Sequence, residues 1–126
     1  MSSVTLVVLT TGVFYAANSL SPESVLRKFI HQGKTYRSDM TIPSRSSDIN
    51  NVLMRVTASL SGSRDLEIIR QERRGEYVLL VSRVKSPEGV PVDYGWVLVE
   101  TSNGWRIDGE ATVRSWAAQG SLFGSQ

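Results

Sequence analysis

The stretch that decides the fold is VDYGWVLVETSNGWRID, residues 92–108. Two apolar, β-rich runs flank Ser102-Asn103-Gly104, and Asn-Gly between such runs is a strong signal for a hairpin. Both central residues of this turn, Asn103 and Gly104, are expected at positive φ, which Gly adopts freely and Asn tolerates. The sequence therefore predicts an antiparallel pair of strands here, and the rest of the chain must supply what covers it.

Length and composition restrict the class of protein. The 126 residues, 40% of them hydrophobic, indicate one globular domain over residues 20–120, followed by a tail at 121–126. The absence of Cys excludes disulfides and thiolate zinc sites, and the single histidine, His31, excludes a multi-histidine metal site. We therefore expect neither a metal nor a cofactor. The net charge of +2 and the Glu residues interleaved with the arginines of the first hairpin do not favour nucleic-acid binding.

Residues 1–19 carry no charged side chain and contain an apolar run. Two interpretations stay open: the segment is a remnant of an export signal or membrane anchor, or it is a folded element. No basic residue precedes the run, which is also short beside the roughly 20 apolar residues that span a membrane as a helix. Membrane contact is expected only if the segment is an anchor, and cytoplasmic and exported locations both stay open.

Two amphipathic helices are predicted before the strands. The first begins with Ser21 as N-cap and Pro22 at the first helical position, and it is expected to end near Ser38 or Asp39. The second begins at Ser46 or Ser47 and stops near Gly62. The apolar positions at helical spacing are Val25, Leu26, Phe29, Ile30 and Tyr36 in the first helix and Ile49, Val52, Leu53, Val56 and Leu60 in the second.

From residue 66 the hydrophobic period changes from helical to alternating, which predicts strands over about 66–72, 77–84, 92–99 and 105–108. Both faces of 77–84 are largely apolar, so this strand should be central and covered on two sides. The segment after Asp108 either extends the last strand or forms a short helix around Ser115-Trp116-Ala117. The order of elements predicts an α+β fold, with N-terminal helices packed on a curved antiparallel sheet of about four or more strands.

Three segments carry a family resemblance: SPESVLRKF at 21–29, EYVLLVSRV at 76–84 and NGWRID at 103–108. In these segments the chain resembles the NTF2-like superfamily, also described as SnoaL-like or cystatin-like α+β cones, over about residues 20–108. The resemblance implies a sheet wrapped around helices, often with a pocket in the cone and often with a dimer formed through the sheet. Some members are isomerases or dehydratases, and others are non-catalytic binding domains or extracytoplasmic domains of secretion assemblies, so the fold alone does not assign a function.

The candidate ligand-binding residues are Tyr36, Arg83, Tyr94 and Trp96. If the face of strand 77–84 that holds Arg83 turns toward the helices, its guanidinium could hold a carboxylate or phosphate. Tyr94 and Trp96 would then add aromatic walls with hydrogen-bonding tips. The alternative is that the aromatic residues belong to the core or to a dimer surface, and that Arg83 reaches solvent.

No pair of residues stands out as a catalytic acid and base. His31 is expected as a partly exposed helix histidine, Asp93 as a solvated carboxylate near a strand entrance, and Asp108 as a turn residue. The leading hypothesis is a non-catalytic ligand-binding or protein-assembly module that forms a homodimer through the sheet and takes a small apolar or anionic molecule in the cone. The rival hypotheses are a small-molecule isomerase or dehydratase, and the extracytoplasmic domain of a membrane-anchored assembly protein.

Overall fold

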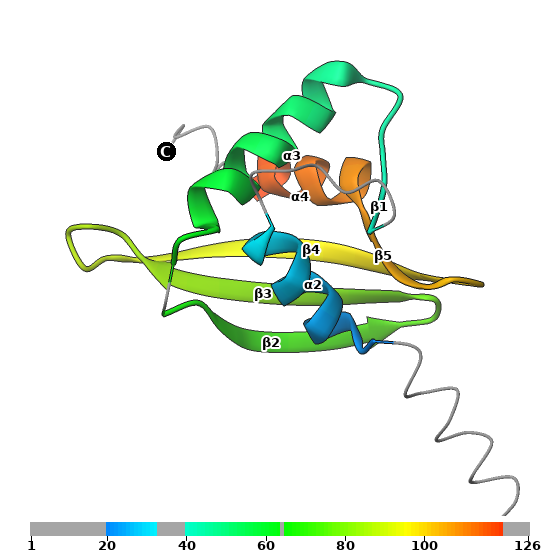
Figure 1. Ribbon diagram of the computed structural model, residues 1–126, viewed down its shortest axis with the longest axis horizontal. Helices are drawn as coiled ribbons and strands as arrows, with labels where there is room; N and C mark the ends of the chain where they lie inside the picture. The colour runs from blue at the N-terminus through cyan, green and yellow to red at the C-terminus, as the bar shows by residue number, and fades with distance from the viewer. Residues whose placement is uncertain (1–19, 33–39, 64, 120–126) are drawn as a thin grey trace, which may run out of the picture.

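The computed structural model describes residues 20–32, 40–63 and 65–119, so the N-terminal segment 1–19, Tyr36 and the tail 121–126 lie outside the described residues. The described chain forms three helices and one five-stranded sheet, which confirms the α+β class. In chain order the elements are α2 (Pro22–His31), β1 (Thr41–Ile42), α3 (Ser47–Leu60), β2 (Glu67–Arg74), β3 (Tyr77–Lys85), β4 (Pro91–Thr101), β5 (Gly104–Asp108) and α4 (Gly109–Gln119) (Figure 1). None of the described helices is both long and apolar enough to cross a membrane.

The starts of α2 and α3 follow the sequence signals. The Ser21 side chain accepts a hydrogen bond from the Ser24 N–H at 3.1 Å, and the Ser46 side chain accepts one from the Ile49 N–H at 3.3 Å. Each hydroxyl satisfies an N–H group that has no partner within the helix, so both predicted N-caps are confirmed. Pro22 at the start of α2 already has the φ that a helix requires.

The predicted end of the first helix differs from the observed one. Helix α2 ends at His31, with Gln32 as its C-cap, instead of continuing toward Ser38 or Asp39. Residues 33–39, where the remainder of the predicted helix falls, lie outside the described residues. Helix α3 ends at Leu60, two residues before the Gly62 that marked its expected stop.

The predicted antiparallel sheet is confirmed, and one short parallel strand at its edge makes the whole sheet mixed. Its strand order is β1-β5-β4-β3-β2, and the four longer strands form an antiparallel meander. Strand β1 pairs in parallel with β5, aligning Thr41 with Ile107, and the Ile107 N–H donates to the Met40 carbonyl at 2.9 Å. The sequence indicated only a connector at β1, because two residues that pair with a segment 66 positions later show no periodicity of their own.

The closing hairpin joins β4 and β5 as predicted, but its turn is of a different kind. Thr101 pairs with Gly104, leaving Ser102 and Asn103 as the loop. Gly104 has a φ of 99°, whereas none of the described non-glycine residues, Asn103 included, has a positive φ. The expectation for Asn103 is therefore wrong, and a single glycine carries the unusual backbone conformation. The Thr101 hydroxyl stabilises the turn, since it donates to the Gly104 carbonyl at 2.7 Å and accepts from the Asn103 N–H at 3.1 Å.

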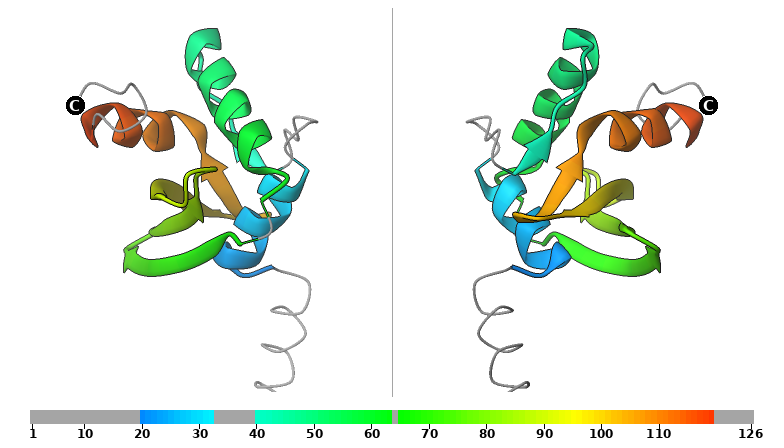
Figure 2. Two further views of the ribbon diagram at one scale, coloured as in Figure 1. Left: turned by 90° about the vertical axis from the view of Figure 1, so that its left-hand side faces the viewer. Right: turned by 90° about the vertical axis from the view of Figure 1, so that its right-hand side faces the viewer.

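Helices α2 and α3 lie on one side of the curved sheet (Figures 1 and 2). The core between them is apolar and closely packed. Its side chains with 0% exposure are Leu26, Leu53, Leu80, Trp96, Leu98, Ile107 and Trp116. These residues come from all three helices and from β3, β4 and β5, so one core joins both halves of the described chain.

Helix α4 settles the alternative left open after Asp108, because the segment is helical over its whole length instead of extending β5. It lies against the edge of β4 that the short strand β5 leaves unpaired. The Val97 N–H donates to the Thr112 hydroxyl at 2.9 Å, and the Trp116 indole N–H donates to the Gly95 carbonyl at 2.6 Å. Two side chains of one helix therefore replace the ladder hydrogen bonds that a longer β5 would have made.

Candidate functional site

Trp96 belongs to the core. Its side chain has 0% exposure, and its indole N–H donates to the Ser82 hydroxyl at 2.9 Å. Its ring meets that of Trp116 edge-to-face, with centroids 5.2 Å apart and an angle of 88° between the planes. Such pairs contribute roughly 0.5–1.5 kcal/mol beyond the burial of their surface. The two indoles therefore fill space beneath the helices where a ligand pocket was expected.

Tyr94 lies on the same face as Trp96 but is only half-buried. Its ring packs edge-to-face on Trp116, with centroids 5.6 Å apart. It also lines a groove of about 620 Å³ between the end of α3 and the β3–β4 turn, together with Leu60, Val84 and Val92. Tyr94 therefore lines a hollow in the surface, as a pocket residue would.

Arg83 lies on the opposite face of the sheet. The buried residues of β3 are Val78, Leu80, Ser82 and Val84. These positions face the helices, so the positions between them, Arg83 included, face away. The condition under which Arg83 was expected to share a pocket with Tyr94 and Trp96 is therefore not met, and the three residues do not form one site.

Arg83 is also already occupied. Its Nε and Nη2 donate to the two carboxylate oxygens of Asp93 at 2.8 and 3.0 Å. These hydrogen bonds lower the pKa of Asp93 and raise that of Arg83 from their ordinary values. Asp93 therefore stays ionised at neutral pH as the acceptor of a bidentate ion pair, which does not suit it to act as a general base.

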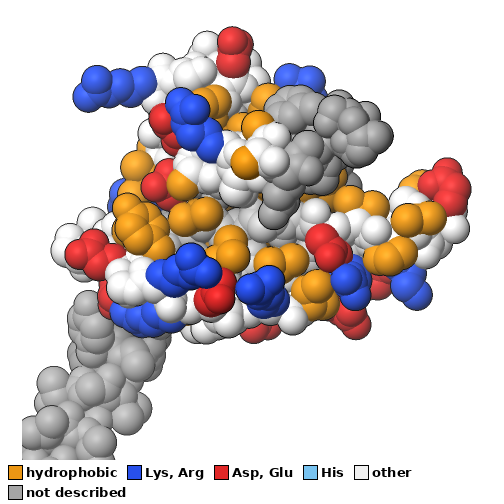
Figure 3. Space-filling view, turned by 180° about the vertical axis from the view of Figure 1, so that it is seen from behind, with side chains coloured by type: hydrophobic (Ala, Val, Ile, Leu, Met, Phe, Trp, Pro, Cys, Tyr) orange, Lys and Arg blue, Asp and Glu red, His pale blue; other side chains and the backbone are white. Residues whose placement is uncertain are grey.

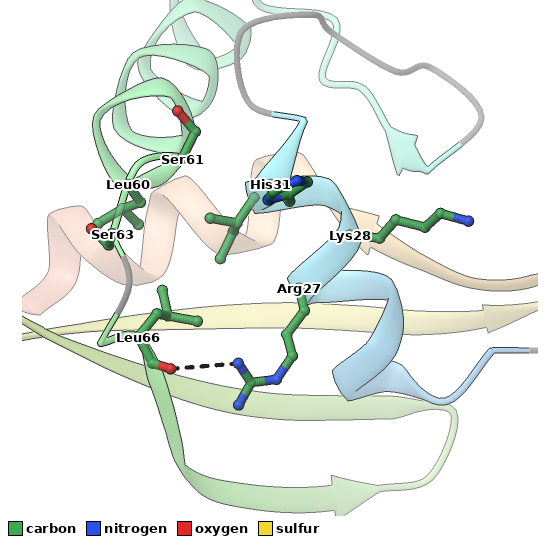
Figure 4. Close-up of a pocket in the computed structure, with 8 residues that line it drawn as sticks. Arg27, Lys28, His31, Leu60, Ser61, Ser63 and Leu66 are labelled. Carbon is green, nitrogen blue, oxygen red and sulfur yellow. Dashed lines mark hydrogen bonds between the residues drawn. The ribbon is translucent and has the colours of Figure 1, made fainter.

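A second groove, of about 370 Å³, lies between the end of α2, the end of α3 and the start of β2 (Figure 4). Its lining combines cationic, hydroxyl and apolar groups. The residues are Arg27, Lys28, Ile30, His31, Leu60, Ser61, Ser63 and Leu66. The Arg27 guanidinium lies at one end, donating to the Leu66 carbonyl at 3.4 Å and paired with Glu23 at 3.0 Å. In Figure 4 the Lys28 side chain points away from Leu60 and Leu66, so Arg27 is the cation nearer the apolar wall.

The side of the sheet turned away from α2 and α3 is called the open face below. On β3 and β4 its positions are Tyr77, Leu79, Val81, Arg83, Asp93, Gly95, Val97 and Val99. Tyr77 is 46% exposed and the Leu and Val side chains are half-buried. Figure 3 views the molecule from this side and shows hydrophobic side chains across its middle, with charged side chains below and between them.

The open face corrects one expectation about β3. The strand is central, as predicted, because it pairs with β2 on one side and β4 on the other. Its second apolar face, however, has no helix packed over it within the described part of the chain; α4 reaches only the edge of β4, where Ser115 lies beside Gly95. The alternating pattern indicated that both faces require cover, and the described residues supply cover for one.

Metal binding has no candidate in the described residues, which contain no cluster of three or more His, Cys, Asp or Glu side chains. Two features were not found by sequence reasoning. One is the Arg27 groove, which depends on how α2 meets the α3–β2 connection. The other is the unpaired state of Arg106 on β5, whose buried Nε has no hydrogen-bond partner. No local pattern reports either, because both arise from contacts between distant segments.

No protein-family model matches this sequence, and no curated protein is significantly similar to it. Among solved structures, the chain is similar to a Campylobacter jejuni protein described as a candidate NTF2-like transpeptidase. The TM-score is 0.47 and the identity 12%, over 71% of this chain and 98% of that chain. At this TM-score and identity the likeness carries no argument about the family or the activity of this chain.

Proposed function

We propose that this chain is a small, non-catalytic assembly module that pairs with a second copy of itself through the open face. The observation that carries the proposal is the strip of Leu79, Val81, Val97 and Val99 at the centre of that face. Contiguous apolar surface of this kind on a soluble domain marks an interaction site, and burying it is favourable by roughly 25 cal/mol per Å². Two-fold self-association buries the same patch on both copies.

The rival proposal of an isomerase or dehydratase has less support. Such an enzyme requires a titratable group in a dry pocket, where burial can tune its pKa. Trp96 and Trp116 occupy the space beneath the helices, and Asp93 is engaged by Arg83 on the other face of the sheet. The proposal of an extracytoplasmic, membrane-anchored domain depends on residues 1–19, which lie outside the described residues.

The test is the oligomeric state of the wild-type chain and of one matched pair of variants, measured by sedimentation equilibrium. Val81→Glu places a charge at the centre of the open face, and we expect it to convert a dimer into a monomer. Val90→Glu makes the same change at a side chain that is 57% exposed in the β3–β4 turn, away from the face, and should leave the dimer intact. A wild-type chain that is monomeric at every concentration, or a Val81→Glu variant as dimeric as Val90→Glu, would refute the proposal.

The groove in Figure 4 favours a second candidate function, the binding of a small anionic molecule with an apolar portion. Arg27 could pair with a carboxylate while Ile30, Leu60 and Leu66 contact a short hydrocarbon chain. The groove volume of about 370 Å³ suits a ligand of that size. This location replaces the interior of the cone, where the sequence led us to expect such a ligand.

A fatty carboxylate of medium chain length, compared with the alcohol of the same length, is the probe for this groove. The carboxylate should raise the melting temperature of the wild type and of Lys28→Ala, whose side chain points away from the apolar wall. It should have little effect on Arg27→Ala. Because the two variants lose the same charge, an equal response from both would show that no specific site exists at Arg27.

A further inference from the structure

The charged side chains of the open face differ between its two ends. Across the end nearest the β2–β3 turn, the paired positions are Arg74, Tyr77, Val99 and Arg106. Across the other end, the paired positions are Glu67, Arg83 and Asp93. The first end thus presents two arginines. At the second end Asp93 neutralises Arg83, which leaves the Glu67 carboxylate in excess; Lys85 lies one pair further out, beside the turn that carries Glu88.

Arg106 is the least satisfied of these groups. Among the described residues, its buried Nε has no hydrogen-bond partner and its guanidinium forms no ion pair. A buried donor at a charged group that lacks a partner is destabilising, so such groups are rare unless something else satisfies them. Arg74 pairs with Glu72 at 3.2 Å, but Glu72 is shared with Arg70 and the Arg74 side chain is 76% exposed. Both arginines at this end can therefore form an ion pair with an acidic side chain of a second copy.

Two symmetric arrangements bring one open face against another with the strands of the two copies aligned. In both, the two-fold axis lies in the plane of the interface, because only such an axis turns one face toward the other. An axis parallel to the strands exchanges the β2 and β5 edges and lays Arg106 over Arg74 of the second copy. An axis perpendicular to the strands keeps equivalent strands together and exchanges the two ends. It lays Arg74 over Glu67 of the second copy and brings Arg106 to the side of its Asp93.

Charge therefore distinguishes the two arrangements. Like charges placed opposite each other across an interface are strongly disfavoured, whereas complementary ends steer association and fix its geometry. We infer that the two copies pair with their strands aligned across a two-fold axis perpendicular to them, with Arg74 against Glu67 and with Arg106 receiving acceptors from the Asp93 end. This inference rests on the proposed self-association and adds its orientation and its charge recognition. Aligned packing of this kind is one of the two ordinary ways in which sheets pack face to face.

Two single charge reversals test the orientation. Glu67 and Arg74 are both exposed, so neither change disturbs the core. In the inferred dimer, Glu67→Arg places two arginine pairs in opposition and Arg74→Glu places two glutamate pairs in opposition. Each variant alone should self-associate roughly tenfold more weakly than wild type at low salt. An equimolar mixture should form heterodimers, because the arginine introduced at position 67 of one variant then faces the glutamate introduced at position 74 of the other. The native Arg74 and Glu67 of the two variants still face each other in that heterodimer.

Native mass spectrometry of the two variants, alone and mixed, provides the measurement. Arg45→Glu, an exposed charge reversal at the start of α3, is the control and should dimerise as wild type does. Recovery of the dimer on mixing supports the inference. If Val81→Glu dissociates the wild-type dimer but the two charge variants associate as tightly as wild type, the orientation is overturned and the proposed function still stands. If Arg106→Glu strengthens dimerisation, the two-fold axis lies parallel to the strands and the inferred orientation is wrong. A monomeric wild type would overturn both the orientation and the proposed function.

Discussion

Thr112→Val tests whether α4 completes the sheet by replacing ladder hydrogen bonds. Thr112 is fully buried, and its hydroxyl accepts the Val97 N–H at 2.9 Å. Val has nearly the same shape, so the substitution creates no cavity. It removes the acceptor of the Val97 N–H and a longer hydrogen bond, of 3.4 Å, from the hydroxyl to the Val97 carbonyl. The N–H of an interior strand is then left without a partner, because β5 ends too early to reach it.

The magnitude follows from that unsatisfied donor. Leaving a buried N–H unpaired costs about 1–3 kcal/mol, and since this bond is only partly buried we expect the lower half, about 1–2 kcal/mol. With a urea m-value of roughly 1–3 kcal/mol per molar, the unfolding midpoint should fall by roughly 1 M. The slope of the transition should stay unchanged, because the variant exposes the same surface on unfolding.

A matched control is available in α3. Thr57 is 1% exposed, and its hydroxyl donates to the Leu53 carbonyl at 2.7 Å. This carbonyl also accepts a backbone hydrogen bond of the helix, so it keeps a partner when the hydroxyl is removed. Thr57→Val makes the same chemical change without leaving a donor unpaired, so its midpoint should lie close to that of wild type. Hydrogen exchange adds a local measurement, since the Val97 amide should lose protection in Thr112→Val alone. Equal midpoints for the two variants, with Val97 still protected, would refute the role given to α4.

Three further outcomes are expected. Asp93→Asn should lower stability at neutral pH because it breaks the ion pair with Arg83. Since the fold lowers the pKa of Asp93, the extra stability of the wild type is present above the pKa of an unfolded Asp, near 4, and is lost as the pH falls below it. Urea titrations of both proteins at several pH values would measure this difference. Trp96→Ala should cost about 3–5 kcal/mol in the same assay, and a cost near zero would contradict its place in the core. Gly104→Ala should destabilise by about 1–3 kcal/mol because of its φ of 99°, whereas Gly62→Ala, where an added Cβ meets nothing within 4 Å, should be neutral or slightly stabilising.

The parts of the fold that local chemistry specifies could be predicted from the sequence. Ser21 and Ser46 cap their helices through hydrogen bonds that span three residues, and the alternation of β3 and β4 sets their pairing whatever else is present. Helix α4 also has a local start signal, because the Asp108 carboxylate accepts from the Ala111 N–H at 3.0 Å, but no local signal gives its position beside the sheet. What defines it is Thr112 and Trp116 binding to β4, 15 and 21 residues earlier in the chain, and no local window contains that information.

The side of the sheet on which Arg83 lies could not be predicted from the alternation. Alternation assigns the residues of β3 to two sets, and because both sets are apolar it does not show which set faces the helices. Ser82 belongs to the buried set. Its hydroxyl tolerates 0% exposure because Trp96 donates to it and it donates to the Tyr94 carbonyl at 3.4 Å. The candidate pocket depended on the Arg83 face turning toward the helices, and the alternation alone does not decide this.

The same pattern explains why the open face matters. A strand that faces solvent on one side has no need of Leu79 and Val81 there, because polar residues at those positions would suit an exposed sheet face. Neighbouring β2 shows that this chain can follow that pattern, since Arg70, Glu72 and Arg74 occupy the corresponding positions one strand away. The apolar strip is therefore confined to the two central strands and bordered by charge. This is how an interface core with a polar rim is arranged, and it differs from a hydrophobic interior left incompletely covered.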